Sequence, residues 1–139
     1  MGSQTIQLSS PPRAASSILA ASSGNVANAS AVATLTPGTG LRAYLQHVTV
    51  SGAGATAGSV VSMTVTGLMG GTQTFNIEVP AGVTTGIGAS NAGVINFDFG
   101  PSGAGLPGAA INTAIVVTVP AFGSGNTNAA VNANGFQSQ

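Results

Sequence analysis

The sequence predicts an all-β fold, a single antiparallel β-sandwich or jelly roll of about seven or eight strands. From residue 41 onward, apolar and polar residues alternate with a period of two, as in a strand that buries one face. The intervals between these runs are rich in Gly, Pro, Asn and Ser, which favour turns and loops. With 139 residues the chain is long enough for one ordinary domain and too short for two.

The first 28 residues are predicted to form an extended N-terminal arm, and residues 29–139 a jelly-roll domain. The arm is rich in Ser, Ala and Pro, so it buries too little apolar surface to order itself. If it is ordered, we expect it to lie on a neighbouring molecule. Within it, Thr5 to Leu8 is a candidate strand, and Ala14 to Ala21 is a weak candidate for a helix because it lacks a polar face.

Two strands are expected between residues 29 and 50. Ala29 to Leu35 alternates weakly, and Leu41 to Val50 alternates more clearly. In the second run the apolar positions change from odd to even numbers around His47. A β-bulge at this point would explain the change, because it adds one residue to one strand of a pair.

Five strands complete the prediction. Three of them have one apolar and one polar face, and their only charged residues, Glu78 and Asp98, fall on the polar faces. The fourth also has apolar residues on its second face, so we expect it to be central or covered on both sides. In chain order the five runs are Val61 to Thr66, Thr74 to Val79, Ile95 to Phe99, Ile111 to Val119 and Ala129 to Phe136.

Charge is nearly absent from the chain. Only 3% of the residues are charged, whereas a typical soluble domain has about 25%. A net charge of zero provides no basic surface for nucleic acid or for the surface of a membrane, so neither partner is expected. No apolar run approaches the roughly 18 residues of a membrane span, and the start of the chain lacks the form of a secretory signal.

No catalytic, cofactor-binding or metal site is predicted, and the chain is not expected to be an enzyme. Gly52 to Ala57 has the outline of a dinucleotide fingerprint, but a strand follows it, so we interpret it as a hairpin loop. A serine triad would need His47 with Asp98 or Glu78, and no nucleophile elbow accompanies them. Glycoside hydrolysis would require Glu78 and Asp98 to act as a catalytic pair. Both are expected on the polar faces of regular strands, where charged side chains are usually only solvated, so we do not expect such a pair. A zinc site needs three or four protein ligands. The chain has one His, two carboxylates and no Cys, which barely reaches that number, so no metal site is predicted.

The uncharged surface predicts association. The chain has no lysine, and the outward residues of the alternating runs are mostly Ser, Thr and Asn. Natural sheet proteins commonly protect exposed sheet edges with Lys, Pro or bulges. Because a monomer with undefended edges and no net charge tends to associate, we expect other subunits to cover much of this surface.

Several segments carry a resemblance to a known family: Leu45 to Val50, Thr74 to Gly82, Phe97 to Gly108, Asn112 to Ala114 and Asn132 to Phe136. Over residues 41–137 the chain resembles the jelly-roll cement or decoration proteins of tailed-phage capsids, of the short-tailed Bordetella phage type. The resemblance implies a structural virion protein, without a cofactor, on the outer surface of the capsid. Its partners would be the major capsid protein, whose neighbouring capsomers it cements, and itself, as a homodimer or else a trimer.

Two other functions stay open from the sequence. The first is a head-fibre or tail module that binds a receptor or a carbohydrate, since jelly rolls often serve that role. The chain has no Trp, and Tyr44 is its one Tyr, which weighs against sugar binding by ring stacking. The second is a subunit of an extracellular filament, which would form open-ended polymers.

Overall fold

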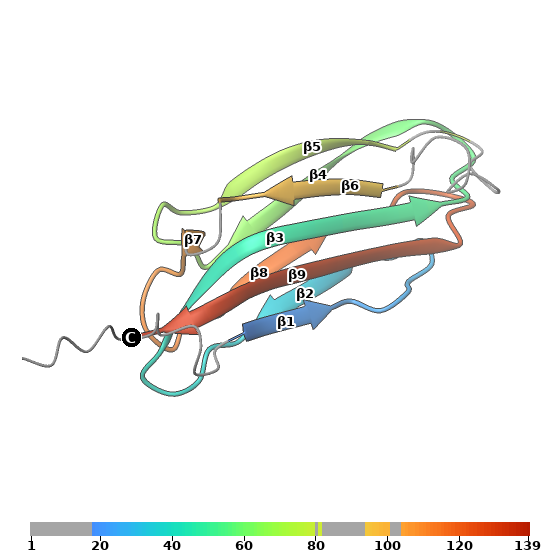
Figure 1. The fold of residues 1–139 in the computed structure, drawn as a ribbon. Helices are drawn as coiled ribbons and strands as arrows, with labels where there is room; N and C mark the ends of the chain where they lie inside the picture. The colour runs from blue at the N-terminus through green and yellow to red at the C-terminus, as the bar shows by residue number, and fades with distance from the viewer. Residues whose placement is uncertain (1–17, 80, 82–93, 101–103) are drawn as a thin grey trace, which may run out of the picture.

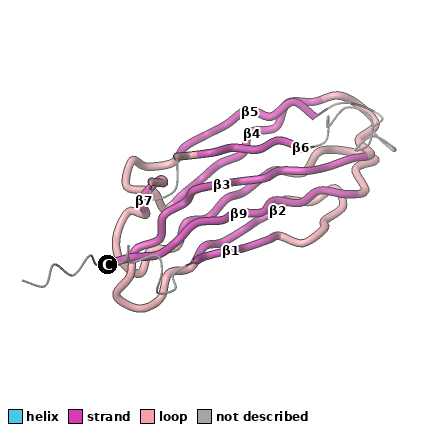
Figure 2. Tube along the Cα trace, viewed as in Figure 1, coloured by secondary structure: helices cyan, strands magenta, loops and turns pink. Residues whose placement is uncertain are grey.

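The computed structural model describes residues 18–79, 81, 94–100 and 104–139. The described residues form nine β-strands and no helix, which confirms the all-β prediction for this part of the chain (Figures 1 and 2). The candidate strand Thr5 to Leu8 lies outside the described residues. The strands are β1 (Ile18–Ser22), β2 (Ala31–Leu35), β3 (Arg42–Ala53), β4 (Ser59–Thr66), β5 (Gln73–Val79), β6 (Val94–Asp98), β7 (Leu106–Pro107), β8 (Ile115–Val119) and β9 (Asn128–Ser138).

Two antiparallel sheets pack face to face as a β-sandwich (Figure 1). Sheet A has the order β1-β9-β3-β6, with the short β7 also paired to β3, and sheet B has the order β2-β8-β4-β5. The pairs are nested along the chain, because β1 pairs with β9, β2 with β8, β3 with β6, and β4 with β5. Strands far apart in the sequence therefore lie side by side.

The core lies between the two sheets. In β2, for example, three alternate side chains are buried and the two between them are exposed, as the period of two predicts. Where edge strands β5 and β6 meet, the Phe75 ring lies 5.1 Å from that of Phe97 and 5.6 Å from that of Phe99, measured between centroids. These aromatic rings close one side of the core between the two sheets.

The predicted bulge near His47 is confirmed. The pairing of β3 with β9 shifts register between Leu45 and His47. On one side of the shift Leu45 is buried, and on the other side Val48 is buried. The extra residue in β3 thus keeps the apolar side chains on the core side of the sheet.

The predicted boundary of the N-terminal arm at residue 28 is wrong. Residues 18–22 form β1, which pairs with β9 along its whole length. The chain stays attached beyond β1, because the Ser23 amide donates to the Val131 carbonyl and Val26 forms a bridge with Ala129. The burial that orders this stretch comes from β9, more than 100 positions later, so local composition could not reveal it.

The strand predicted over residues 111–119 is shorter than expected. It begins at Ile115, whereas Ile111 lies in a turn and is 53% exposed. Asn112 has a left-handed φ of 60°, which a strand residue does not adopt, so the extended run cannot include it. The prediction that this strand is central is confirmed, since β8 lies between β2 and β4.

Residues 54–58 are a loop, as predicted, but they do not close a hairpin. The loop joins β3 of sheet A to β4 of sheet B, so it crosses from one sheet to the other. The Thr56 amide and hydroxyl both donate to the Ser124 carbonyl at 2.9 Å, which ties the loop to the β8–β9 connection. Because β4 and no helix follows, the helix N-terminus that holds a pyrophosphate in dinucleotide sites is missing.

Candidate functional site

The outer face of sheet A is the best candidate for a functional site. The strand registers place its outward side chains in three rows that run across the strands. One row is apolar and the other two are polar, and we call them together the sheet A face. The rows are Ile18, Phe136, Tyr44 and Pro107; Ala20, Asn134, His47 and Asp98; and Ser22, Asn132, Thr49 and Asn96.

His47 belongs to a short chain of hydrogen bonds on this face. The Thr49 hydroxyl donates to Asn96 Oδ1 at 2.9 Å, and it lies 3.1 Å from His47 Nε2. Because the single hydroxyl proton goes to Asn96, Nε2 of His47 is the donor in the second bond. Among the described residues no serine hydroxyl is hydrogen-bonded to His47, so the structure assembles no serine triad around it.

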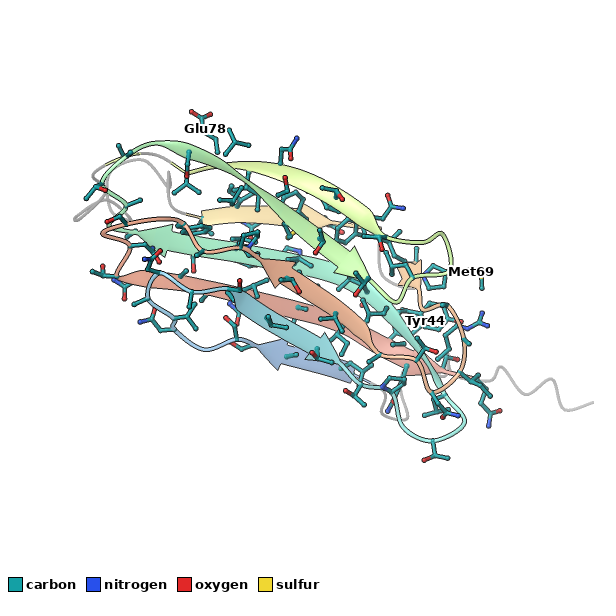
Figure 3. All side chains as sticks on the ribbon, turned by 180° about the vertical axis from the view of Figure 1, so that it is seen from behind. Tyr44, Met69 and Glu78 are labelled. Atoms are coloured by element: carbon teal, nitrogen blue, oxygen red, sulfur yellow. The ribbon has the colours of Figure 1, made fainter. Side chains whose placement is uncertain are left out.

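Asp98 lies directly opposite His47 in the pairing of β3 with β6. Its Oδ1 accepts a hydrogen bond from the Gly100 amide at 3.1 Å, at the end of the strand. Glu78, in contrast, points outward from β5 in sheet B, and Figure 3 shows it at the end of the sandwich opposite to Tyr44. The two carboxylates therefore lie on the outer faces of different sheets and do not form the pair that glycoside hydrolysis requires.

The described residues include one His, one Asp, one Glu and no Cys. Within them, no group of three or more His, Cys, Asp and Glu side chains lies close enough together to hold a metal ion. The same part of the chain contains no helix that is long and apolar enough to cross a membrane.

A shallow groove lies beside the polar rows, between edge strand β1 and its neighbour β9. Its volume is about 370 Å³, and small residues of β1 form one wall while two asparagines of β9 form the other. The sequence does not predict this groove, because the groove depends on the pairing of residues 18–22 with β9, which no local pattern indicates. The lining residues are Ala20, Ala21, Ser22, Asn132 and Asn134.

An aromatic pair borders the polar rows. The rings of Tyr44 on β3 and Phe136 on β9 are stacked, with 4.7 Å between centroids and 1° between ring planes. The outward Ile18 of β1 pairs with Phe136 and is 81% exposed. These residues make one end of the sheet A face apolar, next to the groove.

Exposed apolar side chains also occur at one end of the sandwich, where the β2–β3, β4–β5 and β7–β8 connections gather with the C-terminus (Figure 1). We call this the loop end. Met69 of the β4–β5 connection is 55% exposed there, and Ile111 of the β7–β8 connection is 53% exposed. The loops are tied together, since the Asn112 amide donates to the Leu41 carbonyl and the Met69 amide donates to the Pro107 carbonyl. Figure 3 shows Met69 and Tyr44 at this same end.

Comparison with known proteins finds no family model, no curated protein and no solved structure that matches this chain.

Proposed function

We propose that the protein is a structural virion protein that binds the outside of a phage capsid and cements neighbouring capsomers of the major capsid protein. The resemblance of residues 41–137 to capsid cement proteins suggests this function. The nested pairing of β1 with β9, β2 with β8, β3 with β6 and β4 with β5 supports the jelly-roll topology that the resemblance implies.

The observation that carries the proposal is the nearly uncharged surface of the sandwich. The outward side chains of sheet A include one guanidinium, Arg42, and one carboxylate, Asp98, and those of sheet B include only Glu78 as a charged group. The rest of the sheet B face consists of hydroxyl groups, apolar groups and one amide. They are Thr34, Thr64, Thr66, Thr74 and Thr118, with Ser62, Asn76, Val32, Val60 and Val116. Such a surface suits broad protein contacts better than steering of a charged substrate.

We place the contact with the capsid at the loop end. Met69 and Ile111 project into solvent from two connections that hydrogen bonds hold together. Exposed large apolar side chains on a rigid support are typical of protein contact sites. Many copies bound to one shell would act together, so each contact can be modest and the shell still gains stability.

Electron cryo-microscopy of phage heads that retain the protein, or to which purified protein is added, tests the proposal. We expect ordered β-sandwich density outside the shell, bridging capsomers, with the loop end against the major capsid protein. Heads without this density, or sandwich density found on fibres or on the tail, would overturn the proposal.

Substitutions at the loop end should weaken attachment. Met69→Asp and Ile111→Asp each place a carboxylate in an apolar contact, and burying it should weaken binding to stripped heads by roughly tenfold or more. Val60→Asp is the matched control, because Val60 is 67% exposed on the outer face of sheet B, away from the loop end. Sedimentation of heads with labelled protein measures the bound fraction. Equal loss of binding in all three variants would contradict a contact at the loop end.

Attachment should depend only weakly on salt. Since so few charged side chains are available, apolar burial and hydrogen bonds would have to dominate the contact. Raising the salt from about 0.1 M to about 1 M shortens the Debye length from roughly 10 Å to roughly 3 Å and should leave the bound fraction nearly unchanged. Complete release of the protein from heads by salt alone would show that electrostatic contacts hold it.

A further inference from the structure

We infer that the groove between β1 and β9 on the sheet A face binds a neutral carbohydrate. The groove is shallow and open, with a volume of about 370 Å³, so a ligand would lie along it with one side toward solvent. The groove exists because β1 contributes only small side chains, Ala20 and Ser22, beside the longer side chains of Asn132 and Asn134 on β9. This binding is additional to capsid attachment, which we place at the loop end.

The polar groups of the groove match hydroxyl groups. An asparagine amide offers two N–H donors and an acceptor oxygen, and a sugar hydroxyl both donates and accepts. The side chains of Asn132 and Asn134 form no hydrogen bond with another described residue, whereas the amide of Asn126 forms three. Two adjacent rows thus present, at the groove, amides that have no hydrogen-bond partner within the described part of the chain.

The charge around the groove favours a neutral ligand. The lining residues carry no charge, and the charged residues of the same face, Arg42 and Asp98, lie on β3 and β6. Phosphate or carboxylate groups normally require Arg, Lys or clustered backbone amides, and the groove lining has no Arg or Lys. A neutral, hydroxyl-rich molecule fits this lining better than an anion.

An apolar border accompanies the amides. Ile18 lies two positions before Ala20 on β1, and Phe136 lies two positions after Asn134 on β9. Because alternate residues of a strand are roughly 7 Å apart on one face, a sugar held by Asn134 would reach this border. The C–H groups of a pyranose ring can pack on Ile18, which is 81% exposed, while its hydroxyls reach the amides; Phe136 itself is only 8% exposed and offers little surface.

The site is built on regular strands. β9 pairs with β1 on one side and with β3 on the other, so the backbone positions of its two asparagines are fixed without a ligand. Thr49 and His47, on β3, continue the same polar rows beyond β9. Ligand binding would therefore cost conformational entropy mainly in the two asparagine side chains and not in the backbone.

Nuclear magnetic resonance of the full chain tests the site. The chain has one His and one Tyr, so the ring signals of His47 and Tyr44 report on this face without ambiguity. The probes are neutral oligosaccharides of glucose, galactose, mannose and N-acetylglucosamine, with sialyllactose as the charged comparison. We expect saturable shifts of the two ring signals with at least one neutral sugar, and weaker binding of sialyllactose.

Variants locate the binding. Asn132→Ala and Asn134→Ala should each raise the Kd about fivefold, the effect of one lost hydrogen bond. Ala20→Leu should abolish binding by filling the groove. Asn76→Ala, an exposed asparagine on the outer face of sheet B, is the matched control and should leave the Kd unchanged.

Three results would overturn the inference. They are no shift with any neutral sugar, equal loss of binding in Asn76→Ala, and shifts of the same signals on raising the protein concentration alone, which would show that a second copy covers the face. Attachment to phage heads is measured separately with Asn134→Ala. Retained attachment with lost sugar binding would show that the two functions are distinct.

Discussion

Asn126→Ala is expected to destabilise the sandwich by about 3 kcal/mol, because one buried amide serves three backbone groups. Asn126 is only 4% exposed. Its Nδ2 donates to the carbonyls of Ala53 and Asn128 at 2.8 Å, and its Oδ1 accepts from the Asn28 amide at 2.9 Å. The side chain therefore joins the end of β3, the start of β9 and the β1–β2 loop. Its removal leaves all three groups without this partner.

Urea unfolding followed by circular dichroism measures this loss. The matched control is Asn128→Ala, two positions along, where the exposed side chain makes one hydrogen bond, to the Thr127 hydroxyl. We expect this control to cost less than about 0.5 kcal/mol. Asn126→Asp should also be strongly destabilising, since the new carboxylate oxygen faces two carbonyl oxygens. Equal stability of the Asn126→Ala and Asn128→Ala proteins would show that the buried amide does not hold the three segments together.

Gly135→Ala is expected to cost about 3 kcal/mol, the upper part of the range for overpacking. Gly135 lies in β9 opposite Leu45, at the bulge where β3 and β9 approach closely. A Cβ at this position would overlap the carbonyl oxygen of Tyr44 and lie 3.3 Å from the Cα of Leu45. Both obstacles are backbone atoms of a central strand, so the clash cannot be relieved by a side-chain rotation.

The same unfolding experiment tests Gly135, with Gly70→Ala as control. Gly70 lies in the β4–β5 connection, and the nearest atom to an added Cβ is the end of the Gln73 side chain at 3.9 Å. We expect this control to be neutral or slightly stabilising, since alanine restricts the unfolded chain more than glycine does. A Gly135→Ala protein as stable as the parent would mean that the two central strands separate easily at the bulge.

Most of the strands, all except β1 and β7, were predictable from the sequence because alternation is a local property. A strand with one buried face must place apolar residues at every second position, and β2, β4 and β5 follow this rule. The bulge near His47 was predictable for the same reason, since an extra residue shifts the phase of the alternation within β3. Turn-forming residues in the connections indicated where the strands end.

The candidate site was not predictable, because it depends on which strands pair and in which register. Ala20 and Asn134 face each other across β1 and β9 although 114 positions separate them. The stack of Tyr44 on Phe136 likewise requires both the pairing of β3 with β9 and the bulge between Leu45 and His47. The sequence around a residue does not indicate which residue it pairs with on the neighbouring strand.

The sequence by itself thus determined that this protein is an all-β, nearly uncharged chain, most of whose strands bury one face. Only the tertiary structure decided that residues 18–22 belong to sheet A, that Asn126 joins three segments, and that a groove lies beside Asn132 and Asn134. The physical reason is that burial and hydrogen bonding in a β-sandwich come from strands distant in the chain, whereas the alternating pattern reports only on each strand's own two faces.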